Sequence, residues 1–171
     1  MNNIFKDPRG IFAFVILPAR EKAIQISEAI EFYDSSNTVR IVTLVGGMDY
    51  NTQKIELENA PFIVVGTPGR LAEQLQKNEK GRKYLRNLEY LVLDEGDKLL
   101  DESLLFFIKQ ILELLPSQLI QMIFSTATVE LLDVDRLQEL TKKRKLSTHR
   151  AIEKAKSVSL KYLLMSDHVI N

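Results

Sequence analysis

Two adjacent acids, Asp94 and Glu95, directly follow the apolar run Leu91-Val92-Leu93. A carboxylate at the end of a buried strand can face a magnesium ion, because Mg²⁺ takes one or two carboxylates together with waters and phosphate oxygens. Asp94 would then lie near the ion of a bound nucleotide, and Glu95 would orient or deprotonate the attacking water. Alternatively, the acids cap the following helix, whose N-terminus favours negative charge. The pattern alone leaves both hypotheses open.

Three other motifs have residue types that can hold phosphate groups. Thr67-Pro68-Gly69-Arg70 predicts a helix with threonine at the N-cap and proline at N1, and a free helix N-terminus beside an arginine can bind a phosphate. Gly46-Gly47 allows a ligand to approach the backbone closely, and Arg20, shortly after Pro18, offers a cation. Each motif also has a purely structural explanation: a helix cap, a tight turn, and a surface ion pair with a nearby acid.

Hydroxyl groups and a basic segment complete the candidate residues. Ser125-Thr126-Ala127-Thr128 places hydroxyls after an apolar run, where they could bond to Asp97 or Glu95, or could cap a helix predicted at Val129–Leu140. Residues 141–156 contain seven basic residues and one acidic residue. Such a segment could contact an RNA backbone, or could be a solvated linker. The two histidines have no partner at metal-ligand spacing, so we assign them no role.

Apolar runs that alternate with helical patterns must position these groups. The alternation predicts a parallel sheet covered on both faces, in which ligands bind beyond the carboxyl ends of the strands. Each polar cluster directly follows an apolar run, so we expect all of them at one rim of the sheet. The predicted strands are Ile11–Leu17, Val39–Val45, Phe62–Val65, Tyr90–Leu93 and Leu119–Phe124, with Val158–Met165 as a last strand or exit segment. The predicted helices are Arg20–Tyr33, Asn51–Glu58, Thr67 to about Gln76, Leu104–Leu115 and Val129–Leu140, and Asn78–Asn87 is expected to be irregular.

Composition excludes several classes of protein. A length of 171 residues suits one domain, and a hydrophobic share of 45% excludes a disordered tail. Lys and Arg total 23, as do Asp and Glu, so global charge alone cannot hold a nucleic acid. The absence of cysteine excludes disulfides, thiol nucleophiles and thiolate zinc sites. Ile11–Leu17 is too short to span a bilayer, and the chain is expected to be soluble and intracellular.

In their order and approximate spacing, these motifs resemble the first RecA-like domain of the DEAD-box RNA helicases. The resemblance implies a RecA-like three-layer α/β sandwich with a mainly parallel sheet, and a function in the ATP-dependent remodelling of RNA duplexes or RNA–protein complexes. The stretch from the acids to Leu115 further resembles members that act in ribosome assembly. The match runs from about Gly10 to Val129 and rests on Pro18-Ala-Arg-Glu-Lys-Ala23, Gly46-Gly47, Thr67-Pro-Gly-Arg70, Asp94-Glu-Gly-Asp97 and Thr126-Ala-Thr128.

The resemblance also implies a role for each matched residue. Asp94 corresponds to the carboxylate that reaches Mg²⁺ through the nucleotide, and Glu95 to the carboxylate that activates water. Asp97, Thr126 and Thr128 correspond to the network that couples nucleotide state to RNA strand separation. The residues that correspond to RNA-backbone contacts are Pro18, Arg20, Gly47, Thr67, Pro68, Gly69 and Arg70.

Several residues depart from the family pattern. Gly96 stands in place of the usual alanine, Thr126 of serine, Ala19 of threonine and Lys22 of leucine. The largest difference is that the phosphate-binding loop G-x-x-x-x-G-K-[ST] occurs nowhere in the sequence. We therefore expect an N-terminally incomplete domain, truncated or divergent, that on its own binds ATP and Mg²⁺ weakly or not at all and is inactive as an ATP hydrolase.

The expected organisation follows from this difference. Residues 1–140 would form the partial RecA-like domain, and residues 141–171 a basic linker and exit segment. By the resemblance, an interior strand leads into the phosphate loop. Without a substitute for it, the runs at Leu91–Asp94 and Leu119–Phe124 must close against each other or leave backbone amides unpaired. An exposed sheet edge would invite a second RecA-like domain or another protein partner.

The expected partner is RNA and not a membrane, and the expected location is the nucleus, nucleolus or cytoplasm. The alternative to a helicase part is a non-catalytic RNA-binding or scaffold module derived from a helicase domain.

Overall fold

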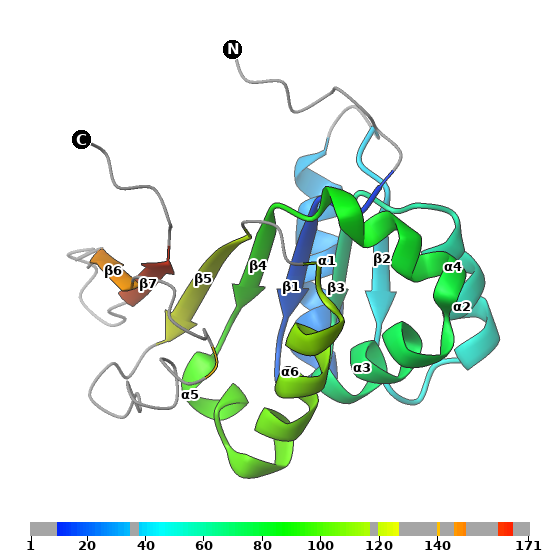
Figure 1. Ribbon diagram of the computed structural model, residues 1–171. Coiled ribbons are helices and arrows are strands. Elements are labelled where there is room, and N and C mark those ends of the chain that lie inside the picture. The colour runs from blue at the N-terminus through cyan, green and yellow to red at the C-terminus, as the bar shows by residue number, and fades with distance from the viewer. Residues whose placement is uncertain are drawn as a thin grey trace.

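One seven-stranded sheet organises the described part of the chain, with strand order β2-β3-β1-β4-β5-β7-β6 (Figure 1). The computed structural model describes residues 10–34, 38–116, 120–126, 140, 146–149 and 161–165. The strands are β1 (Ala13–Ile16), β2 (Ile41–Leu44), β3 (Ile63–Gly66), β4 (Tyr90–Leu93), β5 (Gln121–Thr126), β6 (Leu146–His149) and β7 (Lys161–Met165). The five strands β1 to β5 are all parallel to one another, whereas β7 runs antiparallel to β5 and β6 antiparallel to β7. The predicted parallel sheet is confirmed.

Strands β4 and β5 pair directly with each other. Tyr90 is opposite Gln121 and Leu93 is opposite Phe124, so the two strands stay in register over four residues. This is the first of the two expected alternatives, in which the runs close against each other. The other side of β5 pairs with β7, so the described chain itself supplies the next strand on that side.

Helices cover both faces of the sheet, because alternate residues of each strand point to opposite faces (Figure 1). Helix α1 packs on one face over a cluster that contains Leu17, Val45 and Val65. Helices α3 and α6 lie on the other face, over a larger cluster that contains Phe14 and Leu71. The helices are α1 (Arg20–Tyr33), α2 (Tyr50–Glu58), α3 (Pro68–Lys77), α4 (Glu79–Arg82), α5 (Gly96–Leu99) and α6 (Glu102–Leu114), with a 3₁₀ helix, η1 (Lys83–Asn87), after α4.

The expectation that residues 78–87 are irregular is wrong. Asn78 is buried and starts α4, because its side-chain oxygen accepts a hydrogen bond from the Gly81 amide at 2.9 Å. Its side-chain nitrogen donates to the Lys54 carbonyl at 3.2 Å, which ties α4 to α2. Leu85 is buried and anchors the following 3₁₀ turn. A tertiary contact therefore orders a segment whose polar sequence predicted a loop.

Three further comparisons concern helix α1, the basic segment and the helix predicted at Val129–Leu140. Phe32 is an apolar residue of the helix predicted at Arg20–Tyr33, but it is 82% exposed in the last turn of α1. The segment 146–149, expected within a basic linker, is strand β6. The predicted helix at Val129–Leu140 and the candidate Thr128 lie outside the described residues, apart from Leu140 itself. The domain boundary at residue 140 stays a prediction.

Candidate nucleotide- and RNA-binding rim

The five parallel strands end at one rim of the sheet, and the polar motifs follow them there (Figure 1). Main-chain hydrogen bonds extend the strand pairing one residue beyond β4 and one residue beyond β3. The Asp94 amide donates to the Ile16 carbonyl, and the Thr67 amide donates to the Leu44 carbonyl, each at 3.0 Å. The acid loop therefore adjoins the end of β1, and the start of α3 adjoins the end of β2, so these motifs lie along one rim of the sheet, as the sequence predicts.

The acid loop after β4 has a strained conformation. Glu95 has φ 51° and ψ 48°, in the left-handed region that costs a side-chain-bearing residue about 1–2 kcal/mol. The Asp94 side chain accepts a hydrogen bond from the Glu95 amide at 3.0 Å, which supports this bend. Strain of this kind is retained where the surrounding structure over-determines it, and it concentrates at functional sites.

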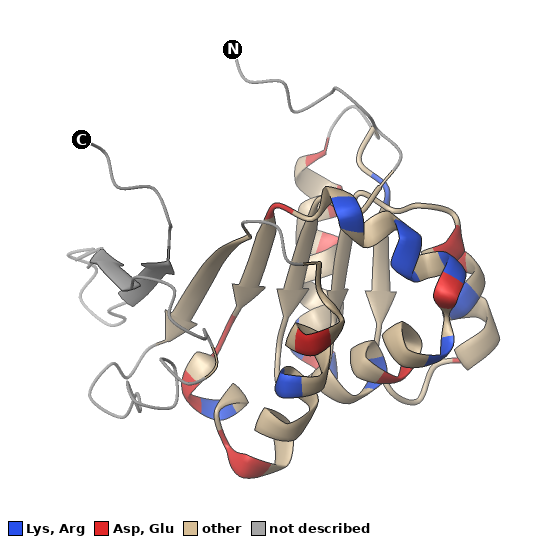
Figure 2. Ribbon diagram, viewed as in Figure 1, with Lys and Arg blue, Asp and Glu red and all other residues tan. Residues whose placement is uncertain are grey.

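The helix-capping alternative for the acids does not describe the observed contacts. Glu95 occupies the N-cap position of α5, but its side chain makes no capping hydrogen bond. Its carboxylate instead accepts a hydrogen bond from Lys98 Nζ at 2.7 Å and lies 4.0 Å from Lys22 Nζ. The bond to Glu95 raises the pKa of Lys98. Two cations thus flank the acid to which the resemblance assigns water activation, and Figure 2 shows this mixture of charges around α5.

Asp97 and Thr126 meet across the rim. The Thr126 hydroxyl donates to Asp97 Oδ1 at 2.9 Å and is almost fully buried at the end of β5. This contact agrees with the expectation that the hydroxyl motif bonds to the acid loop, although the coupling role stays a prediction. Gly96 also contacts this strand: a Cβ there would lie 3.1 Å from the Phe124 ring and 3.5 Å from the Ser125 carbonyl. The glycine that replaces the usual alanine therefore lets α5 pack closely on β5.

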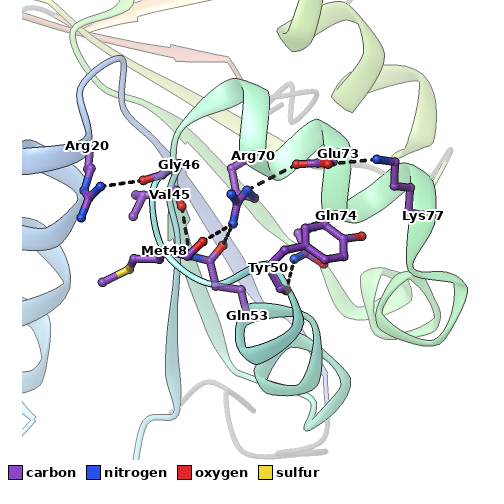
Figure 3. A network of polar contacts seen from close by, with 10 residues as sticks. All are labelled: Arg20, Val45, Gly46, Met48, Tyr50, Gln53, Arg70, Glu73, Gln74 and Lys77. Carbon is purple, nitrogen blue, oxygen red and sulfur yellow. Dashed lines mark hydrogen bonds and ion pairs between the residues drawn. The ribbon is translucent and has the colours of Figure 1, made fainter.

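Side chains from three elements fasten the turn Gly46–Asp49, which follows β2 (Figure 3). From α1, Arg20 Nη1 donates to the Gly46 carbonyl at 2.9 Å. Gly47 has φ 79°, and a Cβ at this position would collide with the Arg20 guanidinium. At Gly47 the space beside the backbone is thus occupied by Arg20, and a close approach of a ligand to the two glycines stays a prediction.

Arg70 holds the same turn from α3 (Figure 3). Its Nη1 donates to the Met48 carbonyl at 3.1 Å and to Gln53 Oε1 at 2.9 Å, while its Nε lies 3.4 Å from a carboxylate oxygen of Glu73. The guanidinium also lies over the Tyr50 ring, 5.7 Å from its centroid. The side chain is only 13% exposed. A direct RNA contact by Arg70 stays a prediction, but in the structure this arginine already binds the turn and side chains of α2 and α3.

The start of α3 has the predicted arrangement. Thr67 is the N-cap, Pro68 is at N1, and the Thr67 carbonyl accepts the first helical hydrogen bond, from Leu71. The Thr67 hydroxyl makes no capping bond. Gly69 lies against Phe107 of α6, because a Cβ there would be 3.8 Å from that ring. The helix end therefore borders the rim, with its first amides near the fastened turn.

Sequence reasoning missed two residues of this rim. Gln53, in α2, is 2% exposed and joins the Val45 carbonyl to Arg70. Lys22 was noted as a departure from the family pattern, but its proximity to Glu95 was not foreseen. The departure itself was the available signal for Lys22, whereas Gln53 sits among other polar residues of α2 and has no local signal.

The described residues meet the requirements of neither of two features, a metal site made by protein side chains alone and a membrane-spanning helix. They include no group of three or more His, Asp or Glu side chains arranged to hold a metal ion by themselves. Within the same ranges, no helix is long and apolar enough to cross a membrane.

The fold and the rim together define a RecA-like helicase domain. The chain belongs to the DEAD/DEAH box helicase family, whose model matches residues 1–137. It is 42% identical over 134 residues to the "ATP-dependent rRNA helicase RRP3" of Mycosarcoma maydis, covering 78% of this chain and 24% of the relative. The namesake from Schizosaccharomyces pombe is 41% identical over 138 residues, covering 81% of this chain and 29% of the relative.

Solved structures agree with this assignment. Mss116p bound to single-stranded RNA and AMP-PNP matches with a TM-score of 0.65 and 29% identity, covering 81% of this chain and 28% of that one. A DEAD box protein from the hyperthermophile Methanococcus jannaschii matches with a TM-score of 0.64 and 30% identity, covering 78% of this chain and 34% of that one. The chain thus spans about a quarter to a third of the proteins that it resembles.

Proposed function

We propose that this chain is the RNA-contacting part of an ATP-dependent RNA helicase and binds single-stranded RNA through the phosphate backbone. The observation that carries the proposal is the rim itself, along which the fastened turn Gly46–Asp49, the start of α3, Arg20 and the acid loop all lie. All three features suit phosphate groups, and none presents an extended surface for reading base edges. The Mss116p structure with bound RNA supports RNA as the ligand.

The test of RNA binding is a pair of arginine substitutions near opposite ends of β2, since the Arg20 side chain bonds to the turn after β2 and Arg40 directly precedes this strand. Arg20→Gln removes a cation at the rim, whereas Arg40→Gln removes one that bonds to the Asn59 carbonyl at 2.7 Å, before β2 begins. Fluorescence anisotropy with a labelled single-stranded RNA should show weaker binding only for Arg20→Gln, with a shallower dependence on salt. The loss should be similar for RNAs of different sequence. Equal losses for both variants, or a loss confined to one RNA sequence, would contradict the proposal.

We further propose that ATP–Mg²⁺ binds this chain only weakly. Asp94 reaches a magnesium ion through nucleotide phosphates, and the 171 residues contain no G-x-x-x-x-G-K-[ST] loop to hold them. Isothermal titration should therefore give weak or undetectable binding. Binding at micromolar affinity would refute this part and would show that other groups hold the phosphates.

A second candidate function is a non-catalytic RNA-binding module. It is favoured by the position of Glu95, whose carboxylate faces Lys98 and Lys22 and is partly neutralised by them. Under this hypothesis RNA binding persists when Asp94 and Glu95 are both changed to their amides, and the double change alters no activity of the whole gene product. Loss of RNA-stimulated ATP hydrolysis in the whole product would instead decide for the helicase. The relatives' names suggest ribosomal RNA as the target, which crosslinking in cells would test by enrichment of rRNA precursors.

A further inference from the structure

Three side-chain contacts hold carbonyl groups at and just before the turn after β2. Gln53 Nε2 donates to the Val45 carbonyl at 3.0 Å, and Arg20 Nη1 donates to the Gly46 carbonyl at 2.9 Å. Arg70 Nη1 donates to the Met48 carbonyl at 3.1 Å. The three donors come from α2, α1 and α3, so the surrounding helices determine how these peptide groups face (Figure 3).

The orientation of these carbonyls decides where the neighbouring amides point. In a planar trans peptide, the N–H points away from the C=O of the same group. Holding the carbonyls of residues 45, 46 and 48 toward protein donors therefore turns the amides of Gly46, Gly47 and Asp49 the other way. Within the described ranges, no group accepts a hydrogen bond from these three amides. Successive free amides in a turn form a concave site for an anion.

We propose that Gln53 is a positioning residue for RNA, because it orients this turn so that its free amides meet a backbone phosphate. This inference rests on the proposed RNA binding. Gln53 is 2% exposed and cannot itself reach the ligand. Its amide nitrogen serves the Val45 carbonyl while its amide oxygen accepts from Arg70 at 2.9 Å. It thus connects two of the three contacts that hold the turn.

The chemistry of the position favours glutamine. A side-chain amide offers both a donor for the Val45 carbonyl and an acceptor for Arg70 from one planar group. Glutamate would place an oxygen against the carbonyl oxygen, and methionine would leave the Val45 carbonyl without this donor and Arg70 without one of its acceptors in a buried site. Either change should free the Val45 peptide to rotate, and the amide of Gly46 would rotate with it.

Gln74 provides a matched control. It is also a fully buried glutamine, on α3, and its Nε2 donates to the Tyr50 carbonyl at 3.0 Å. Tyr50 is the first residue of α2, so Gln74 holds none of the three carbonyls of the turn. Both Gln53→Met and Gln74→Met should lower the melting temperature, and Gln74→Met should do so less, because Gln74 Oε1 has no hydrogen-bond partner among the described residues whereas both amide atoms of Gln53 are bonded. Only Gln53→Met should weaken binding of a labelled single-stranded RNA, by about tenfold for the loss of one or two hydrogen bonds to phosphate.

The salt dependence separates positioning from loss of charge. Neutral amides release few counterions, so Gln53→Met should lower RNA affinity without changing the slope of log affinity against log salt. Arg20→Gln should make that slope shallower. A merely structural defect in Gln53→Met would lower the fraction of active protein and leave the dissociation constant of the remainder unchanged.

A measurement on the unmodified chain keeps the test independent of how the variants fold. In two-dimensional amide NMR spectra, titration with single-stranded RNA should shift the signals of Gly46, Gly47 and Asp49. Failure of the chain to bind RNA at all would overturn the proposed function. Binding that leaves these signals in place, or an unchanged dissociation constant in Gln53→Met, would overturn only the role of Gln53.

Discussion

Two adjacent glycines should respond in opposite ways to the same substitution. Gly47 has φ 79°, a conformation that glycine adopts freely, and an added Cβ would collide with the Arg20 guanidinium. Gly46 has no heavy atom within 4 Å of an added Cβ, and its φ lies outside the left-handed region. Gly47→Ala and Gly46→Ala therefore remove the same freedom from the unfolded chain, but only one of them strains the folded state.

The size of the effect follows from the backbone. An alanine in the left-handed region costs about 1–2 kcal/mol, and the displaced hydrogen bond of Arg20 is exposed and adds little. For a chain of this size, 1 kcal/mol lowers the melting temperature by about 2–4 °C, so Gly47→Ala should melt about 2–8 °C lower. Gly46→Ala should be neutral, or more stable by about 0.4–1 kcal/mol, because it restricts only the unfolded chain.

Differential scanning calorimetry measures both variants, and RNA anisotropy adds a functional readout. Gly47→Ala should also weaken RNA binding, because Arg20 can no longer hold the turn in place. A ratio of calorimetric to van't Hoff enthalpy near one would establish that the comparison is of two-state unfolding. Equal melting temperatures for the two variants would refute the assigned conformation of Gly47 and the clamp by Arg20.

Substitutions at three other positions test particular contacts. Thr126→Val should cost about 1–2 kcal/mol by removing a buried bond to Asp97, and Thr126→Ser should restore most of it in thermal melts; no recovery would exclude the hydroxyl as the cause. Hydrogen bonds from Thr52 lower the pKa of Asp49, so the stabilisation from this cap of α2 is present above pH 3.8 and is lost as the pH falls through the lower pKa of the folded state. The melting temperature of Asp49→Ala should lack this dependence on pH in the acid range. The raised pKa of Lys98 means that its bond to Glu95 stabilises below pH 10.5 and is lost as pH rises through the higher folded value. In Lys98→Met the melting temperature should therefore depend less on pH in the alkaline range, and an unchanged pH dependence would count against a stabilising Lys98–Glu95 contact.

Much of the rim could be predicted because it depends on local patterns. Apolar runs bounded by glycine, proline or acids mark where parallel strands end, and those ends must share one edge of the sheet. The predicted helix at residues 20–33 matches α1, and the Asp97–Thr126 contact was among the predicted alternatives. The approximate order and spacing of the motifs were sufficient to identify the family, because order and spacing are properties of the sequence itself.

What the sequence could not decide was which groups each polar side chain would contact. Arg70 was assigned to a phosphate, yet the folded chain surrounds it with Met48, Gln53, Glu73 and Tyr50. These partners belong to two different helices and a turn, and only the packing of α2 beside α3 brings them within bonding distance. A guanidinium with such partners is desolvated and held in place, so its role depends on neighbours that are distant in the sequence. The sequence by itself determined the class of domain and the rim at which we propose that RNA binds. The tertiary structure decided which side chains of the rim are exposed and which are buried and hydrogen-bonded within the fold, because burial and hydrogen bonding are set by contacts between elements.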